Sequence, residues 1–154
     1  MWITQNRFAR VVLVLALMRW LFVLVLLAST GCASQPSAEQ LLERYLQSSD
    51  AGQVEVFTDL LAGSALQSAE SANKVMAGLN LRQIGNTRFH SFSSSSEDEY
   101  DFCLDVSQTR LIDQFGNDLT PLDRPEQLPM RMRIEKFGGE EKISEIDIRR
   151  YSNC

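Results

Sequence analysis

Two apolar runs separated by one arginine dominate the first 31 residues. Residues 11–18 read VVLVLALM, residues 20–28 read WLFVLVLLA, and Arg19 stands between them. A helix that spanned a membrane with both runs would hold Arg19 near the bilayer centre, which costs about 3 kcal/mol. A secretory signal peptide needs only a basic residue and one apolar run of about 7–15 residues. The pattern therefore favours a cleaved export signal, which leaves the rest of the chain to form the folded domain.

The second apolar run ends in small residues and a cysteine. Residues 27–32 read LASTGC, and a polar linker over residues 33–36 follows Cys32. This ending resembles the lipobox of bacterial lipoproteins, in which the cysteine receives diacylglycerol and becomes the first residue of the mature chain. The resemblance implies a signal peptide over residues 1–31 and a lipid anchor at Cys32. It also implies a location in the cell envelope, at the outer face of a bacterial membrane.

Two translation starts fit this signal. From Met1 the signal is 31 residues long and contains a charge in its middle. From Met18 it is shorter, and Arg19 leads into a single apolar run that reaches Gly31. Both lengths lie at the edges of the usual range of about 15–30 residues. Either start leaves the same mature chain, which begins at Cys32.

Without the signal the chain is acidic. Residues 1–31 contain three arginines and no acid, so residues 32–154 hold 12 basic and 20 acidic residues, a formal charge of −8. Binding to a polyanion requires the opposite balance of charge. We therefore expect no nucleic-acid partner.

Two cysteines remain when Cys32 is assigned to lipid. Disulfides form in the oxidising compartments to which exported proteins go, so we expect a bond between Cys103 and Cys154. The alternative is a pair of free thiols, but neither cysteine has the Cys-x-x-Cys spacing of redox sites. A zinc site would need four ligands, and these two cysteines with His90 supply three. We predict no metal and no cofactor.

Apolar residues at helical spacing predict three helices in the first half of the domain. Ser37 and Gln40 have the spacing of a capping box, and the helix that they begin is expected to end within residues 48–52. A second, short helix is expected to end at Gly63, and a third to run from Ser64. The inward positions are Leu41, Leu42, Tyr45 and Leu46, then Val54, Phe57, Leu60 and Leu61, then Leu66, Ala69, Val75, Met76 and Leu79.

From about residue 81 the apolar residues alternate with polar ones, which predicts strands. The expected strands lie around residues 89–92, over residues 100–106, from residue 111, over residues 130–135 and over residues 143–148. The expected connections are a polar loop over residues 93–97, a turn over residues 114–117 and a proline-rich segment over residues 121–129. The isoleucines of the last strand change parity, which predicts a β-bulge.

Helices followed by an antiparallel meander predict one α+β domain over residues 37–154, with the helices on one face of a curved sheet. The order resembles the NTF2-like and cystatin-like folds. The segments YDFCLDVS, RLID, GND and PMRM, which begin at residues 100, 110, 116 and 129, look like those of small NTF2-like lipoproteins of actinobacteria. The resemblance covers about residues 37–151 and implies a fold and a location more than an activity.

Candidate catalytic residues are few. His90 has no acid or nucleophile at a recognisable spacing, so we expect it at the surface or at a sheet edge. NTF2-like enzymes use an aspartate with a histidine or tyrosine in a deep apolar cone, and Tyr100, Asp101 and Asp105 are the residues here that could take such roles. The alternation of the strand places both aspartates opposite Phe102, so a solvated or cross-strand position is the simpler expectation.

The cross-strand partner expected for these aspartates is Arg131 or Arg133. With Arg149 and Arg150 these arginines are interpreted as the solvated face of edge strands, interleaved with acids, rather than as a site for anionic lipid. The methionines at 76, 130 and 132 suit an adaptable core or a pocket, and the core is the default expectation.

Two acidic segments are interpreted as solvated loops. One comprises the carboxylates of residues 97–101, which follow four serines. The other comprises Asp113, Asn117 and Asp118 around Gly116, which do not reproduce the ligand spacing of a calcium loop.

These observations favour a lipid-anchored envelope protein with a non-catalytic domain that binds a protein partner or a small apolar ligand. One alternative is an NTF2-like enzyme, which requires a buried carboxylate in an apolar pocket. The other is a spacer or dimerisation module, which requires an exposed apolar patch. The depth of a pocket between sheet and helices should discriminate among the three.

Overall fold

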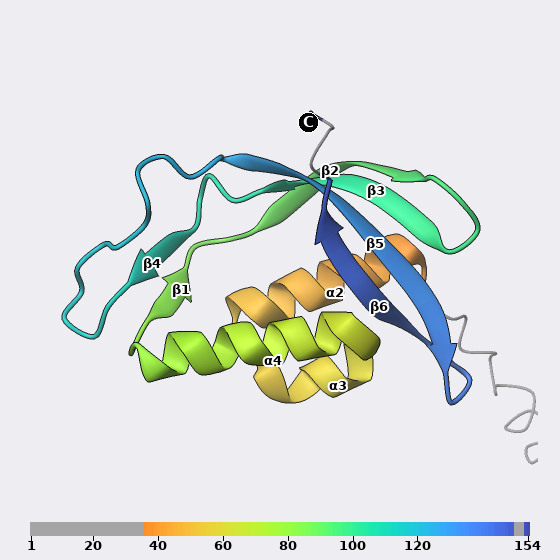
Figure 1. The fold of residues 1–154 in the computed structure, drawn as a ribbon, viewed down its shortest axis with the longest axis horizontal. Coiled ribbons are helices and arrows are strands. Elements are labelled where there is room, and N and C mark those ends of the chain that lie inside the picture. Colours follow the sequence, from red (N-terminus) through yellow and green to blue (C-terminus); the bar gives the residue numbers. More distant parts are fainter. Residues whose placement is uncertain (1–35, 150–152) are drawn as a thin grey trace, which may run out of the picture. The chain divides into compact units, whose positions relative to one another are not determined.

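The computed structural model describes residues 36–149 and 153–154 (Figure 1). The predictions for the signal, for Cys32 and for Arg150 therefore lie outside the described residues. Within the described part, no helix is long and apolar enough to cross a membrane.

The first helix, α2 (Ala38–Asp50), begins as expected. The Ser37 side chain accepts a hydrogen bond from the Gln40 backbone N–H, and the Gln40 side chain accepts one from the Ser37 N–H, which confirms the capping box. Leu41, Leu42 and Leu46 recur at helical spacing and are buried. The apolar face of α2 therefore becomes part of the core.

The second helical segment is shorter than expected. A 3-10 turn, η1 (Val54–Val56), leads into α3 (Phe57–Leu60), after which Leu61 is extended and forms a parallel bridge with Ile143. The Ala62 N–H then donates to the Ile143 carbonyl at 2.9 Å. These contacts with the sheet end the helix before Gly63, which was expected to end it.

Gly63 is instead the first residue of α4 (Gly63–Gly78). Its φ of +53° favours glycine, and a Cβ there would lie 3.0 Å from the Ser144 carbonyl oxygen. Ala65 is buried on α4, but Val75 and Leu79, expected to face inward, are 60% and 62% exposed. The expectation was wrong for these two residues because the second half of α4 runs past the sheet that would cover it.

All strand pairs are antiparallel and form two sheets. The larger sheet has the order β2-β3-β5-β6 and comprises β2 (Arg88–Ser94), β3 (Glu99–Asp105), β5 (Gln127–Phe137) and β6 (Glu140–Ile148). The smaller sheet pairs β1 (Arg82–Ile84) with β4 (Arg110–Ile112). Because β1 precedes β2 and β4 follows β3, the smaller sheet is the bent continuation of the β2–β3 hairpin (Figure 1). We call β1, β4 and the loop over residues 113–126 the arm.

The bend between the two sheets depends on one glycine. Gly85 has a φ of +94°, and a Cβ there would lie 2.0 Å from the Gln108 carbonyl oxygen. Close by, the buried Thr109 accepts a hydrogen bond from the Arg124 guanidinium at 2.9 Å. Arg124 also donates to the Val106 carbonyl at 2.8 Å. The backbone at the bend is therefore close-packed, and its carbonyl groups are hydrogen-bonded.

The core lies between the helices and one face of the larger sheet, so the protein has the expected α+β fold. Its sheet side includes Met130 and Met132, as expected, together with Phe102. The buried members of the core are Leu41, Leu42, Leu46, Phe57, Leu60, Leu61, Ala65, Phe102, Met130, Met132, Ile134 and Ile143.

The bulge predicted for the last strand is present. The register of β5 and β6 shifts between Arg133 and Ile134, and Ser144 is the extra residue beside Ile143. Both Ile143 and Ser144 are therefore buried. The Ser144 carbonyl accepts a hydrogen bond from the Ser64 hydroxyl at 3.2 Å, so the bulge also helps to hold the start of α4.

Two strand boundaries differ from expectation. β2 continues to Ser94, two residues into the expected loop. Pro129, expected in a connection, lies inside the central strand β5 opposite Cys103. Its carbonyl accepts from the Arg149 N–H at 2.8 Å, just past the end of β6. In an antiparallel strand, the backbone N–H and C=O of one residue point toward the same neighbouring strand. The nitrogen of Pro129, which carries no hydrogen, therefore points toward the side of β6, at the position where the pairing of β5 with β6 ends.

Candidate functional site

A cleft of about 380 Å³ lies between α2, α4 and the start of β1. Its apolar surface comes mainly from Tyr45, Val54, Phe57, Ala69, Ala72 and Met76, and its polar groups from Ser49, Asp50, Asn73, Arg82 and Gln83. Clefts that bind small ligands combine these properties: an apolar wall and a few polar groups that converge on it.

The cleft exists because α4 has small side chains where it passes α2. Ala65, Leu66 and Ala69 pack against the core, but from residue 70 to the end of α4 every side chain except that of Met76 is exposed. Alanine at positions 69 and 72 is too short to bridge the space to α2. The second half of α4 therefore forms one wall of an open cleft rather than a packed helix pair.

Tyr45 of α2 projects an aromatic ring and a hydroxyl into the cleft. The ring packs edge-on against Phe57, with ring centroids 5.7 Å apart. Burial raises the pKa of the Tyr45 hydroxyl, which is therefore protonated at neutral pH. No hydrogen bond joins this hydroxyl to another described residue, so it can donate to or accept from a ligand.

Asp50, the last residue of α2, fixes the side of the cleft nearest the arm. Its carboxylate accepts from the Thr87 backbone N–H at 2.6 Å, from the Thr87 hydroxyl at 2.7 Å and from the Gln83 side chain at 2.8 Å. Both carboxylate oxygens are thus hydrogen-bonded, to Gln83 of β1 and to Thr87 in the connection from β1 to β2. This arrangement assigns Asp50 a structural role in spacing α2 from β1.

Arg82 and Asn73 stand at the mouth of the cleft, on β1 and α4 respectively, and both are exposed. Neither makes an ion pair or a side-chain hydrogen bond with a described residue. They add a cation and an amide to the polar groups that a ligand could meet.

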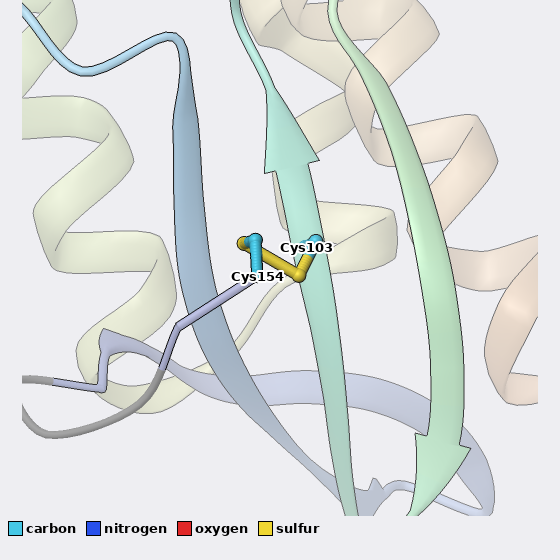
Figure 2. Close-up of a disulfide and its surroundings, with 2 residues drawn as sticks. All are labelled: Cys103 and Cys154. Carbon is cyan, nitrogen blue, oxygen red and sulfur yellow. A yellow bond between two sulfur atoms is a disulfide. The ribbon is translucent and has the colours of Figure 1, made fainter.

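A disulfide joins Cys103 of β3 to Cys154 (Figure 2), with Cα atoms 5.6 Å apart. This is the pair that the sequence suggested. Cys103 is buried, and the bond closes a loop with a sequence separation of 51 residues. The disulfide lies outside the cleft, so its role is to hold the last residue against the sheet.

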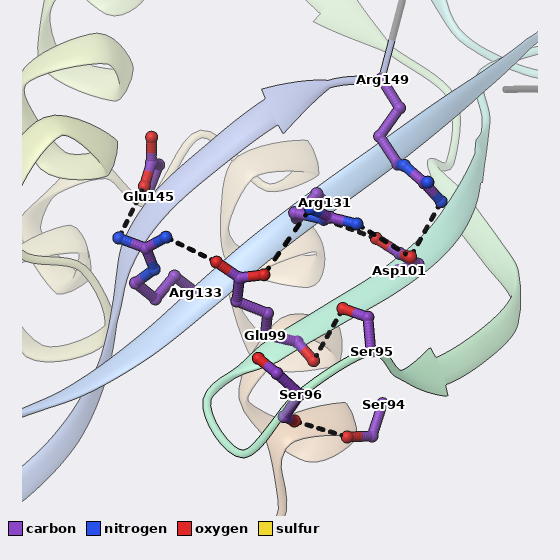
Figure 3. Close-up of polar contacts among 9 residues, drawn as sticks. All are labelled: Ser94, Ser95, Ser96, Glu99, Asp101, Arg131, Arg133, Glu145 and Arg149. Carbon is purple, nitrogen blue, oxygen red and sulfur yellow. Dashed lines mark hydrogen bonds and ion pairs between the residues drawn. The ribbon is translucent and has the colours of Figure 1, made fainter. Parts of the chain in front are cut away.

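The carboxylates suggested as catalytic candidates, Asp101 and Asp105, do not line the cleft. Asp101 lies on the outer face of the sheet, beside Arg131 and Arg149 (Figure 3). Asp101 is paired with Arg131 of β5 at 2.9 Å, as the cross-strand prediction required, and with Arg149 at 2.8 Å. The hydrogen bond from Arg131 holds the pKa of Asp101 below its usual range. Asp101 is therefore an ionised structural partner.

Further ion pairs lie beside those of Asp101 on the sheet. Glu99 contacts both Arg131 and Arg133, and Arg133 also reaches Glu145 at 3.5 Å (Figure 3). The hydrogen bond from Arg133 lowers the pKa of Glu99, whereas a shared hydrogen bond with Asp147 raises that of Glu145. The arginines and acids are interleaved, as expected from the sequence.

The other sequence candidates are also outside the cleft. His90 is exposed on the edge strand β2, and Tyr100 stacks on Phe92 with centroids 5.4 Å apart. Asp105 accepts from the Ser107 N–H at 2.9 Å, a bond that lowers its pKa. The structure therefore does not bring the candidate tyrosine, histidine and aspartates together around a pocket.

The acidic loop around Gly116 is closed on itself. Asp113 accepts from the Phe115 and Asn117 backbone N–H groups and from the Asn117 side chain, each at 2.8 Å. In the part of the chain that the structure describes, no group of three or more His, Cys, Asp or Glu side chains could hold a metal ion.

Sequence reasoning missed the cleft and most of the residues that form it. Tyr45 was expected on the inward face of its helix, Met76 was expected in the core by default with a pocket as the alternative, and Asp50, Asn73 and Arg82 were not singled out. A usable signal was present, because Ala69, Ala72 and Met76 place mostly small side chains on the face of α4 toward α2.

No family model matches the chain, and no curated protein matches it. Among solved structures, it is similar to the crystal structure of a de novo designed protein with a curved β-sheet. The two are 14% identical, the match covers 73% of this chain and 98% of that chain, and the TM-score is 0.37.

Proposed function

We propose that the protein is a cell-envelope lipoprotein, acylated at Cys32, whose domain binds a small, mostly apolar ligand in the cleft between α2 and α4. The observation that carries the binding function is the cleft itself, whose volume of about 380 Å³ falls within the usual range for small-ligand sites. The anchor rests on the small residues that precede Cys32 and on the linker that follows it.

The ligand that suits this cleft has an apolar body and one hydrogen-bonding group. Phe57, Ala69 and Met76 offer apolar contact, and the free hydroxyl of Tyr45 offers a neutral donor and acceptor. The desolvation cost of that hydroxyl is small only if the ligand supplies a partner for it. A purely hydrocarbon ligand should therefore bind less well than its alcohol or acid.

A binding role is favoured over catalysis because of how the nearest carboxylate is held. Among the described residues that line the cleft, Asp50 is the one acidic residue. Both of its carboxylate oxygens accept hydrogen bonds, from Thr87 or Gln83. These hydrogen bonds give the Asp50 carboxylate a structural role rather than a catalytic one.

We also propose that the domain is NTF2-like. Its support is the arrangement of the helices on one face of an antiparallel sheet (Figure 1), together with the bend at Gly85 between the larger sheet and the arm.

The methionines provide a direct test of the cleft. Residues 32–154 contain three, of which Met76 lines the cleft while Met130 and Met132 are buried in the core. The domain has its own core and disulfide, so residues 33–154 can be secreted without the anchor and labelled with ¹³C at the methionine methyl groups. Titration with decanol should shift the Met76 resonance to saturation and leave that of Met132 unchanged.

A matched pair of variants controls this experiment. Ala72→Phe places a ring in the cleft and should weaken decanol binding by about tenfold or more, since it removes the space for the ligand. Ser68→Phe adds the same ring to an exposed position of α4 outside the cleft and should leave affinity unchanged. Equal effects of the two variants, or no saturable shift at Met76, would refute binding in the cleft.

A further inference from the structure

Exposed apolar side chains gather at one end of the molecule. Among the described residues, six of the large apolar side chains that are clearly exposed belong to the end of α4, to the residue that caps it or to the arm. They are Val75 of α4, the C-cap residue Leu79, Ile84 of β1, and Phe115, Leu119 and Leu122 of the arm loop. The remaining three are Val54, Phe137 and Ile148. The segments that carry the six meet at the end of the fold where β1 and β4 lie (Figure 1).

The arm loop presents its apolar residues as protrusions. Phe115 is 80% exposed and Leu122 is fully exposed, so neither rests on a neighbouring side chain. Three hydrogen bonds to Asp113 fix the turn that carries Phe115, one of them from the Phe115 backbone N–H. The ring is therefore held at the tip of the loop without folding back onto the sheet.

We propose that the arm loop inserts its exposed apolar side chains, Phe115 at the turn beyond β4 and Leu119 and Leu122 on the returning chain, into the surface of the bilayer that holds the acyl chains of Cys32. This inference rests on the lipid anchor proposed above. Separate apolar protrusions fit a deformable lipid phase, which closes around each side chain, whereas a flat apolar patch fits a second folded surface.

The length of the chain keeps the arm within reach of that bilayer. Six Cα steps separate Cys32 from Ala38, which limits their distance to about 21 Å. The 13 residues of α2 then extend about 20 Å to Asp50, whose carboxylate holds Thr87 at the base of the arm. An anchored domain therefore keeps its arm at a high local concentration of lipid, so that weak insertion suffices.

The charged side chains of the arm give it no preference for anionic or cationic lipid headgroups. Asp118 faces Arg110 at 3.7 Å and accepts from the Thr120 N–H, and Asp113 is bonded within the loop. Insertion should therefore depend on apolar contact and occur in uncharged phosphatidylcholine. Anionic lipid should add little.

The test uses the absence of tryptophan from the mature chain, because Trp2 and Trp20 both precede Cys32. Acylated protein carrying Phe115→Trp is reconstituted into phosphatidylcholine vesicles with or without bromine on the acyl chains. The matched control is Glu97→Trp, in the exposed polar loop at the other end of the β2–β3 hairpin. We expect brominated lipid to remove about half of the Phe115→Trp emission and to leave that of Glu97→Trp unchanged.

Flotation of the vesicles separates the two proposals. If both variants float but Phe115→Trp is not quenched, the anchor holds and the insertion of the arm is refuted. If neither variant floats, the anchor itself is wrong. If the emission of Phe115→Trp shifts to the blue with rising protein concentration but independently of bromine, a second copy covers the arm, and the bilayer proposal fails.

Discussion

The Asp50 carboxylate and the Thr87 backbone N–H lie 2.6 Å apart, and through this hydrogen bond the end of α2 is held to the base of the arm. A second bond, from the Thr87 hydroxyl at 2.7 Å, joins the same two residues. The contact bridges residues 37 positions apart and borders the cleft. The width of the cleft at this side is therefore set by a polar contact between the end of α2 and the connection from β1 to β2.

Asp50→Ala should lower the free energy of unfolding by about 2–3 kcal/mol, because Thr87 and Gln83 lose a charged acceptor in a half-buried position. It should also weaken decanol binding, since the spacing of α2 from β1 is no longer fixed. Urea unfolding and the Met76 titration measure the two effects.

Asp59→Ala is the control for this variant, because Asp59 is an exposed aspartate on α3. Its effect on stability should be within about 0.5 kcal/mol. If Asp50→Ala were as mild, the contact with Thr87 would not be holding the arm.

Gly85→Ala should destabilise the protein by about 3 kcal/mol. The new Cβ would lie 2.0 Å from the Gln108 carbonyl oxygen, and the residue would keep a φ of +94°. Gly116→Ala is the matched control, because Gly116 has a similar φ of +87° but open space around it. It should lose only about 1 kcal/mol, from backbone strain. Equal losses in urea unfolding would contradict the close contact at the bend.

Reduction of the Cys103–Cys154 disulfide should lower the free energy of unfolding by about 4 kcal/mol, the loop-closure value for a separation of 51 residues. Unfolding curves with and without reductant give this value. The double variant Cys103→Ser/Cys154→Ser should be insensitive to reductant. A wild-type protein that is also insensitive would show that the bond adds no stability.

Asp101→Asn should reduce stability at pH 7 by about 1 kcal/mol and make the protein less sensitive to acid. The pKa of Asp101 is lowered in the folded state, so its contribution is present above the unfolded pKa of about 3.9 and is lost as pH falls through the folded value. The stability difference between wild type and variant should therefore shrink below about pH 4.

Glu97→Gln serves as the control for the acid experiment, since Glu97 makes no ion pair with a described residue and is exposed. It should follow the wild-type pH profile. A constant difference between wild type and Asp101→Asn from pH 7 to pH 2 would exclude a stabilising ionised Asp101.

Local patterns predicted much of this fold. The capping box at Ser37 fixed the start of α2, the change of parity after Ile143 located the bulge, and the alternation around Asp101 gave its pairing with Arg131. Each of these features depends on residues close in sequence or directly opposite on a neighbouring strand. The pattern of apolar and polar residues carries that information.

The cleft could not be predicted in the same way, because it depends on how far α4 extends beyond the elements that pack against it. Helical spacing marks Val75 and Met76 as one apolar group, but α4 extends beyond the larger sheet, so Val75 is exposed and Met76 borders a cleft. The bend at Gly85 depends on a contact with Gln108 that joins distant parts of the chain. Periodicity does not record such contacts.

Acylation of Cys32 is the claim on which the location of the protein and the reach of the arm depend. The most direct measurement is the intact mass of the protein purified from its own membranes, compared with that of a Cys32→Ser variant. We predict a chain that begins at Cys32 and carries the added mass of its acyl groups, and a variant that lacks this mass. An unmodified chain that retains residues 1–31 would contradict the account.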